Sequence, residues 1–266
     1  MPPKELPYDM GNAGDLVKHG LLGEFVRWWC EQESGTLRYL DPFAGPPWVS
    51  PPSPEVTRRV QSLPRCAIRD AQPRPDERYY GSSFVVPNAA KAYGSSAKVW
   101  VSDSDPEARD LFRACRPPIE EIKTPRFSPS DGFSILDCQV DADLLLLDPF
   151  GEFLKERANS EIPKIADVSS RLACVLFVLN LDPSNRVGLQ YRSLRSKHLP
   201  NAWSLHCPKL PGTPVRGEAT YEVEVLLAWQ RLVGHPGRDI LKNRIKAYAR
   251  SLSEVLNAEI KFSDAG

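Results

Sequence analysis

The sequence feature that most constrains the fold is a pair of apolar runs, each closed by the same three residues, Asp-Pro-Phe. The first run spans residues 37–40 and leads into Asp41-Pro42-Phe43-Ala44-Gly45. The second spans residues 144–147 and leads into Asp148-Pro149-Phe150-Gly151. Short apolar runs that end at turn residues are typical of strands buried in a parallel sheet. Such sheets bind their ligands just outside the carboxyl ends of the strands, so both aspartates mark a candidate site.

Strands and helices are expected to alternate along most of the chain. The expected strands span 37–40, 98–102, 120–124, 144–147, 173–179, 202–207 and 221–229, and the expected helices span 15–33, 82–93, 106–115, 162–171, 184–197 and 238–256. This alternation predicts an α/β fold with a mostly parallel, seven-stranded sheet whose late strands form an antiparallel edge. We expect residues 1–266 to form a single domain, in which residues 48–96 are an inserted flap or helical segment.

Composition and charge limit the classes of protein to which this chain can belong. The chain has 266 residues with 34 basic and 34 acidic side chains, so it lacks the basic excess of a strong non-specific nucleic-acid binder, although a local basic face stays open. No apolar run approaches the roughly 20 residues that cross a bilayer, and residues 1–5 lack the apolar core of a signal peptide. We therefore expect a cytoplasmic protein without membrane contact. Six scattered cysteines form no CxxC pair, which argues against a zinc site or a disulfide framework, and we expect no metal.

Three strand-end positions are candidates for binding a nucleotide-like ligand. Gly45 lets the backbone approach a ligand closely, although a glycine turn alone is weak evidence. Asp103 follows the second strand, where a carboxylate accepts the hydroxyl hydrogens of a ribose. The alternative for Asp103 is helix capping, for which Asp105 is better placed. Asp131 and Gly132 open the next helix, where the carboxylate either binds an adenine amino group or caps the helix.

The loop after the second Asp-Pro-Phe strand is the candidate for catalysis. Asp148 and the carbonyl of Pro149 can hold a nitrogen nucleophile, and Phe150 can stack on a flipped base. Such a loop orients a weakly nucleophilic amino group towards an electrophilic methyl group, so its contribution is mainly positioning. The alternative is an ordinary turn after a buried strand, but loops at strand ends often carry function.

The glycine-rich stretch 11–19 opens the first helix. Lys18 and His19 fall near its first turn, where cations oppose the helix dipole. An unfavourable placement without evident gain hints at function, and the alternative is a solvated lysine and a capping histidine. Two later basic stretches, 184–197 and 238–250, either contact phosphates or lie on solvated helix faces. Phosphate contacts of this kind would position a substrate without specifying it.

Taken in order, these stretches resemble the bacterial methyltransferases that modify an adenine N6 in large-subunit ribosomal RNA, the RlmJ type. The family pattern A-G-N-x-A-D-V-L-K-H is matched by residues 10–19, and L-D-T-H-A-G-A-G by residues 40–47. Tyr79-Tyr80-Gly81-Ser82, Asp131-Gly132-Phe133 and the strand into Asp148-Pro149 also have counterparts. The order and spacing agree over nearly the whole chain. The three-Cys-motif partner proteins look similar at Phe43-Ala44-Gly45 and at residues 148–151.

The resemblance implies a Rossmann-like class I methyltransferase that uses S-adenosylmethionine and acts on an exocyclic adenine amine in RNA or DNA, with RNA favoured. It implies that Asp148 and Pro149 begin the catalytic loop, with Phe150 beside them. It implies cofactor contacts from Lys18, His19, Asp41, Phe43, Ala44, Gly45, Ser82, Asp103, Asp131, Gly132 and Asp148.

Two departures from the family pattern keep other functions open. Pro47 replaces a glycine, and Phe150-Gly151 replaces the Pro-Tyr of the family's catalytic loop. Proline fixes φ and lacks an N–H, so one backbone donor to the cofactor is lost. One alternative is a methyltransferase that acts on a protein or a small molecule. The other is a non-catalytic or partner-dependent binding module of the same fold, working with a protein partner.

Overall fold

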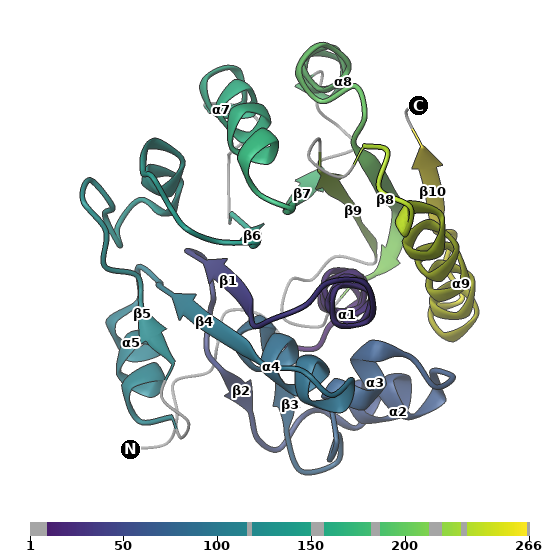
Figure 1. The fold of residues 1–266 in the computed structure, drawn as a ribbon. Helices are drawn as coiled ribbons and strands as arrows, with labels where there is room; N and C mark the ends of the chain where they lie inside the picture. Colours follow the sequence, from purple (N-terminus) through teal and green to yellow (C-terminus); the bar gives the residue numbers. More distant parts are fainter. Residues whose placement is uncertain are drawn as a thin grey trace.

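The computed structural model describes residues 10–115, 119–149, 157–181, 187–212, 220–229 and 233–264. An eight-stranded sheet with the order β10-β8-β9-β7-β6-β1-β4-β5 runs through them (Figure 1). The strands are β1 (Leu37–Asp41), β4 (Ala97–Val101), β5 (Glu120–Glu121), β6 (Leu144–Leu147), β7 (Cys174–Leu181), β8 (Trp203–Pro211), β9 (Thr220–Ala228) and β10 (Lys261–Asp264). A separate two-stranded ribbon pairs β2 (Trp48–Val49) with β3 (Tyr79–Tyr80).

Five neighbouring strands, β5-β4-β1-β6-β7, run parallel, and β9, β8 and β10 complete the sheet in antiparallel pairs. In chain order the parallel strands read 3-2-1-4-5, as in a Rossmann-like doubly wound sheet. The order reverses between β1 and β6, where Leu40 lies opposite Leu145. Ligands of such sheets bind at this switch point, outside the carboxyl ends of the strands. Asp41 ends β1 and Asp148 directly follows β6, so the topology places both aspartates at this switch point.

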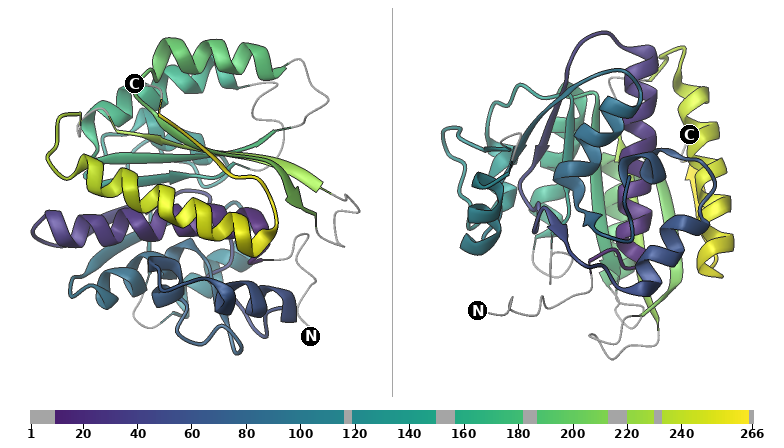
Figure 2. Two further views of the ribbon diagram at one scale, coloured as in Figure 1. Left: turned by 90° about the vertical axis from the view of Figure 1, so that its right-hand side faces the viewer. Right: turned by 90° about the horizontal axis from the view of Figure 1, so that it is seen from below.

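Helices cover both faces of the sheet (Figure 2). The helices of one face are α1 (Ala13–Gln32), α4 (Ser82–Ala92) and α9 (Arg238–Leu256), against which α2 (Pro54–Ser62) and α3 (Ala67–Ala71) pack. Those of the other face are η1 (Gly132–Asp137), α7 (Ala158–Arg171) and α8 (Val187–His198), and α5 (Pro106–Arg113) packs beside the edge strand β5. Cover on both sides explains why the central strands lack polar alternation, as the four consecutive buried leucines of β6 show.

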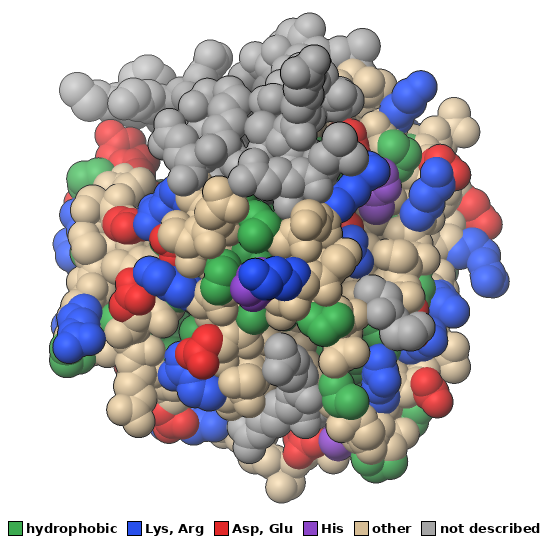
Figure 3. Space-filling view, turned by 90° about the horizontal axis from the view of Figure 1, so that it is seen from above, with side chains coloured by type: hydrophobic (Ala, Val, Ile, Leu, Met, Phe, Trp, Pro, Cys, Tyr) green, Lys and Arg blue, Asp and Glu red, His purple; other side chains and the backbone are tan. Residues whose placement is uncertain are grey.

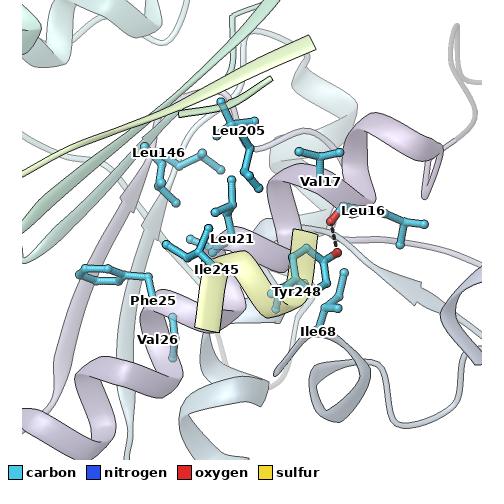
Figure 4. Close-up of a cluster of buried hydrophobic side chains, with 14 of the residues drawn as sticks. Leu16, Val17, Leu21, Phe25, Val26, Ile68, Leu146, Leu205, Ile245 and Tyr248 are labelled. Carbon is cyan, nitrogen blue, oxygen red and sulfur yellow. Dashed lines mark hydrogen bonds between the residues drawn. The ribbon is translucent and has the colours of Figure 1, made fainter. Parts of the chain in front are cut away.

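The helix α1 is fixed by its packing in the middle of one face. Its apolar side chains contact strands β6 and β8 and the helix α9 (Figure 4). Gly20 lets the backbone of α1 approach the ring of Tyr248, because a Cβ at this position would overlap that ring. The Tyr248 hydroxyl then donates to the Leu16 carbonyl over 2.6 Å. This packing sets the position of Lys18, which lies half a turn further along the same helix.

The secondary structure agrees closely with the expectation from sequence. The bounds of α9 and β6 are those expected, and the other expected elements are present with ends shifted by up to four residues. The sequence predicts seven strands, and the structure has an eighth, β10, at the sheet edge. Its residues alternate between exposed and half-buried, with Phe262 as the one large apolar side chain, so its pattern is too weak to recognise. None of the described helices is both long and apolar enough to cross a membrane.

Candidate functional site

Asp148 follows the carboxyl end of β6 and is joined there by Lys18 of α1. The Lys18 ammonium nitrogen lies 2.5 Å from Asp148 Oδ2 and 3.0 Å from Asp15 Oδ1, and all three side chains are largely buried. Asn12 caps the helix by accepting from the Asp15 N–H. Lys18 stands in the second turn of α1 rather than the first. The two carboxylates offset the cost of placing a cation near a helix N-terminus, which accounts for the unfavourable placement noted in the sequence.

Asp15 holds the charge of Lys18 in place. One of its oxygens accepts from the Gly11 N–H over 2.8 Å. Burial alone would raise the pKa of Asp15, but the charge of Lys18 and the Gly11 N–H keep that pKa below its usual value. Buried charges persist only when they are paired and hydrogen-bonded. Asp15, Lys18 and Asp148 therefore form one charged cluster at this end of the sheet.

His19 is enclosed in the interior beside this cluster. It is 2 % exposed, and its Nδ1 lies 2.8 Å from the hydroxyl oxygen of Tyr79. Burial, and to a smaller extent the charge of Lys18, lowers the pKa of His19 to about 3, so the imidazole is neutral. His19 therefore neither caps the helix nor presents a charge. The cofactor contact expected for His19 stays a prediction.

Asp41, at the end of β1, is hydrogen-bonded through both of its oxygens. Oδ2 accepts from the hydroxyls of Tyr39 at 2.8 Å and Ser82 at 2.5 Å, and Oδ1 accepts from the Phe43 N–H at 3.1 Å. Asp41 is 0 % exposed and Ser82 3 %. Burial raises the pKa of Asp41 to about 6. The structure thus brings Asp41, Phe43 and Ser82 together, with the two polar side chains fixing the loop from within, and their cofactor contacts stay predictions.

The turn after β1 is tied to the turn after β4. Gly45 has a φ of +63°, which glycine adopts without strain, and its N–H donates to Asp103 Oδ2 over 2.9 Å. Ala44 beside it donates its N–H to the Ser102 carbonyl over 3.1 Å. Asp103 Oδ1 accepts from the Asp105 N–H, and Asp105 is the residue that caps α5. Each oxygen of Asp103 keeps acceptor capacity for a ribose hydroxyl, because a carboxylate oxygen has two lone pairs.

Asp131 caps η1, and its carboxylate also binds an arginine. Its Oδ1 accepts from the Phe133 N–H, and Arg157 donates to both oxygens over 2.7 and 3.0 Å. The hydrogen bond with Arg157 is the main reason that the pKa of Asp131 is lowered. Gly132 lies against the Phe43 ring, where a Cβ would meet a ring atom at 2.5 Å. The capping role of Asp131 is confirmed, whereas its adenine contact stays a prediction that has to compete with Arg157.

Part of the expected catalytic loop falls outside the residues that the structure describes. Pro149 is buried directly after Asp148, whereas Phe150 and Gly151 lie outside the described residues, so the stacking role of Phe150 stays a prediction. Pro47, the other departure from the family pattern, has a defined contact. Its carbonyl accepts from the Gly81 N–H over 2.9 Å and so joins the ends of the β2–β3 ribbon.

Sequence reasoning missed two residues that position the candidate site. Tyr39 lies two residues before Asp41 and therefore on the same face of β1, which is a signal that the sequence does contain. Arg157 binds Asp131 across 26 positions, and no sequence pattern links the two. The contact of Lys18 with Asp148 spans 130 positions and was likewise not expected as a pair.

The basic helices α8 and α9 are partly neutralised by local partners. Arg195 of α8 lies 2.6 Å from Glu224, and Arg244 of α9 binds Glu31. Seen from the side of α7 and α8, cationic and anionic side chains of the described residues are interspersed (Figure 3). For both stretches the described contacts therefore favour solvated helix faces over a phosphate-binding face.

Comparison with known proteins identifies the fold. The chain is similar to the crystal structure of protein LPL1258 from Legionella pneumophila, whose family model is DUF519, with a TM-score of 0.66, 15 % identity and coverage of 96 % of this chain and 98 % of that chain. A probable spermidine synthase from Corynebacterium glutamicum matches with a TM-score of 0.48, 12 % identity and coverage of 91 % and 75 %. No family model and no curated protein sequence matches. At this identity the first similarity shows the fold alone, which agrees with the Rossmann-like strand order.

Proposed function

We propose that this protein is a methyltransferase that transfers a methyl group from S-adenosylmethionine to an exocyclic adenine amine (N6) in nucleic acid, RNA rather than DNA. The observation that carries the proposal is Asp148, held by Lys18 outside the carboxyl end of β6, at the point where the strand order reverses. The ordered resemblance to the RlmJ type supplies the substrate class. The fold shared with the DUF519 protein supports the architecture that such a reaction requires.

The residues at the ends of β1, β4 and β6 fit this cofactor. Asp103 can accept ribose hydroxyls, and the positive φ of Gly45 brings the backbone close to a ligand. The charged cluster of Asp15, Lys18 and Asp148 adds two carboxylates at the same sheet edge. S-adenosylmethionine, when bound, supplies an electrophilic methyl group on a positively charged sulfur, next to which carboxylates are electrostatically favoured.

In the proposed step the adenine amino nitrogen attacks the methyl carbon. The new nitrogen–carbon bond forms as the carbon–sulfur bond breaks, the bonding pair returns to sulfur, and the methylated amine releases one proton to water. Asp148 accepts one N–H of the amine and the Pro149 carbonyl accepts the other, which fixes the direction of the nitrogen lone pair. Lys18 contacts Asp148 Oδ2, and a carboxylate has a second oxygen with which to bind the amine.

A methyltransferase with a protein or small-molecule substrate is the second candidate. The interspersed charges over α7 and α8, and the ion pairs that occupy Arg195 and Arg244, favour it over an enzyme with a broad phosphate-binding face. A non-catalytic or partner-dependent binding module is the third candidate, supported by Pro47 and by the pairing of Asp131 with Arg157.

Calorimetric titration with S-adenosylmethionine tests the cofactor site first. We expect micromolar binding that is weakened in Asp103→Ala. A second assay follows methyl transfer from labelled S-adenosylmethionine to unpaired RNA, to DNA of the same sequence and to total protein. Transfer to RNA that is retained on adenine N6 supports the proposal, whereas transfer to protein alone supports the second candidate. Absence of binding at millimolar cofactor would leave the non-catalytic module as the better account.

A further inference from the structure

The β2–β3 ribbon has an inner and an outer face. Trp48 pairs with Tyr80 across the ribbon, and Val49 pairs with Tyr79. Because side chains alternate along a strand, the two pairs point to opposite faces. Tyr79 is fully buried and contacts His19, and Val49 packs against the main core. Trp48 and Tyr80 therefore lie on the other face, which we call the outer face. Both stay partly exposed there, and Trp48 and Phe84 also pack along one side against the buried apolar cluster of β4 and α5.

Two further side chains extend this outer face. Phe84, from the first turn of α4, lies edge-on to the Trp48 ring with centroids 5.6 Å apart, and its ring centroid is 5.4 Å from that of Tyr80. The Arg78 guanidinium carbon lies 4.7 Å from the Trp48 centroid and 5.9 Å from the Tyr80 centroid. All four side chains are partly exposed. We call Trp48, Arg78, Tyr80 and Phe84 the aromatic platform.

Arg78 differs from neighbouring arginines in its contacts. Arg59 pairs with Glu55 at 2.6 Å and Arg74 pairs with Glu77 at 3.2 Å. Within the described part of the chain, Arg78 contacts aromatic rings and meets neither a carboxylate nor a carbonyl acceptor. Stacking fixes the plane of a guanidinium and leaves its N–H donors along the edge. Arg78 thus presents oriented donors beside two aromatic rings.

We propose that the aromatic platform is a stacking site for an unpaired base of the RNA substrate. This inference rests on the proposed function and adds the place at which the protein binds the substrate strand. Proteins that recognise single-stranded RNA stack splayed bases on aromatic rings and on arginine planes. The guanidinium edge suits the acceptors of a base or of the adjacent phosphate. The composition of the segment that carries the platform agrees with an anionic strand, since residues 48–96 have seven basic and four acidic side chains, against 34 of each in the whole chain.

The platform is built on the two segments that lead to the proposed cofactor loop. Trp48 comes three residues after Gly45, and Tyr80 comes two residues before Ser82, which donates to Asp41. A base held on the platform therefore anchors the substrate strand at the sheet edge that carries the proposed reaction. Double-stranded RNA offers no splayed base, so the platform should discriminate in favour of unpaired RNA.

Fluorescence anisotropy with a labelled ten-nucleotide oligoadenylate tests this inference. We expect Trp48→Ala and Arg78→Ala each to weaken binding about tenfold, as for loss of one stacked base. Arg74→Ala is the matched control, because it removes the same charge four residues away, from an exposed ion pair, and should change the affinity by less than about twofold. Arg78→Lys keeps the charge but loses the plane, so we expect it to bind almost as weakly as Arg78→Ala.

The outcomes separate this inference from the proposed function. Calorimetry with S-adenosylmethionine is run on every variant, and we expect affinities within about twofold of the unaltered protein because no platform residue is assigned to the cofactor. One outcome is that the unaltered protein binds cofactor and methylates RNA while Trp48→Ala keeps the same RNA affinity and KM. In that case the stacking-site proposal is wrong and the proposed function is retained. Wild-type binding by Arg78→Lys, or preference for a duplex of the same length, also overturns the platform. If the unaltered protein binds no RNA, both proposals fail.

Trp48→Ala removes a large ring and could alter the local fold. Circular dichroism and thermal unfolding of each variant check this point, and Arg78→Ala carries the test if Trp48→Ala unfolds. The Arg78 side chain is partly exposed and contacts only ring faces among the described residues, so its removal leaves the ribbon hydrogen bonds in place.

Discussion

The same three residues, Asp-Pro-Phe, stand at the ends of the neighbouring strands β1 and β6, and the two aspartates differ in what they contact. Asp41 is fully enclosed and accepts hydrogen bonds from Tyr39, Ser82 and a backbone N–H. Asp148 keeps 9 % exposure, and its partner among the described residues is Lys18. The same tripeptide therefore supports a loop at one strand end and presents a candidate reactive group at the next.

Part of the difference comes from the residue two places before each aspartate. That residue shares the face of the strand with the aspartate. In β1 it is Tyr39, whose hydroxyl reaches Asp41. In β6 it is Leu146, which has no donor. Asp148 instead pairs with Lys18, a cation of the helix α1. Its other carboxylate oxygen remains available to bind a ligand.

The sharpest test of the comparison removes the carboxylate of Asp148. We expect Asp148→Ala to lower the rate of methyl transfer by roughly 1,000-fold, about 4 kcal/mol of barrier, because the amine loses its orientation. Lys18 keeps Asp15 as a partner in this variant, so we expect a smaller loss of unfolding free energy than for Asp41→Ala. Rate constants from single turnover and urea unfolding curves measure both effects. Full activity in this variant would exclude Asp148 from the reaction.

Removal of the other carboxylate should act on the fold instead. Asp41→Ala leaves the buried hydroxyls of Tyr39 and Ser82 without their acceptor, so we expect a loss of about 3 kcal/mol of unfolding free energy. Urea denaturation with matched m-values measures it. The comparison between the turns breaks down if Asp41→Ala is as stable as the unaltered protein, or if Asp148→Ala proves to be the less stable of the two.

Asp103, which follows the strand β4, tests whether the cofactor site extends beyond Asp41 and Asp148. Asp103→Ala should weaken the binding of S-adenosylmethionine by about 2 kcal/mol, as for hydrogen bonds to a charged group. Part of this loss would come from Gly45, whose N–H loses its acceptor. Asp105→Ala is the control, because it removes the cap of α5 and leaves Asp103 in place. Equal cofactor affinities for the two variants would reject the ribose role.

The two aspartates should also differ in their response to pH. The pKa of Asp41 is about 6 when folded, above its ordinary value of 3.8, chiefly because of burial. The folded state then binds more protons between these values, so the contribution of Asp41 is full below the ordinary value and is lost as the pH rises through about 6. We expect this loss to be on the order of 2 kcal/mol. Unfolding free energies of the unaltered protein and of Asp41→Asn at about pH 4 and about pH 7 isolate the contribution of Asp41. The same pH dependence in both proteins would contradict this assignment.

The fold was largely predictable from sequence because the parallel strands and α9 have strong patterns. The four leucines of β6 and the apolar stripe of α9 gave both elements with their bounds. β10 could not be predicted, since its one large apolar residue is Phe262 and it is held by pairing with β8 rather than by its own pattern.

The candidate site was predictable in its residues but not in its contacts. Strand ends and turn chemistry identified Asp41, Asp103 and Asp148 without reference to any partner. The partners come from distant parts of the chain, as Lys18 does for Asp148 and Arg157 does for Asp131. Spacing within a helix or a strand carries no information about such pairs, because only the tertiary fold brings them together.

Some of the contacts that secure α1 come from residues that are synthesised late, near the C-terminal end of the chain. Tyr221 of β9 accepts from the Gly14 N–H at the start of α1, and Tyr248 of α9 donates to Leu16, so contacts made 207 and 232 residues later secure this helix. A ribosome that adds about 5 to 20 residues per second needs roughly 10 to 45 seconds to cover that interval. The position of Lys18, and with it the salt bridge to Asp148, therefore depends in part on contacts that form only when most of the chain has left the ribosome. An arrested nascent chain that lacks α9 would carry every proposed catalytic residue without the contact that α9 makes with the start of α1.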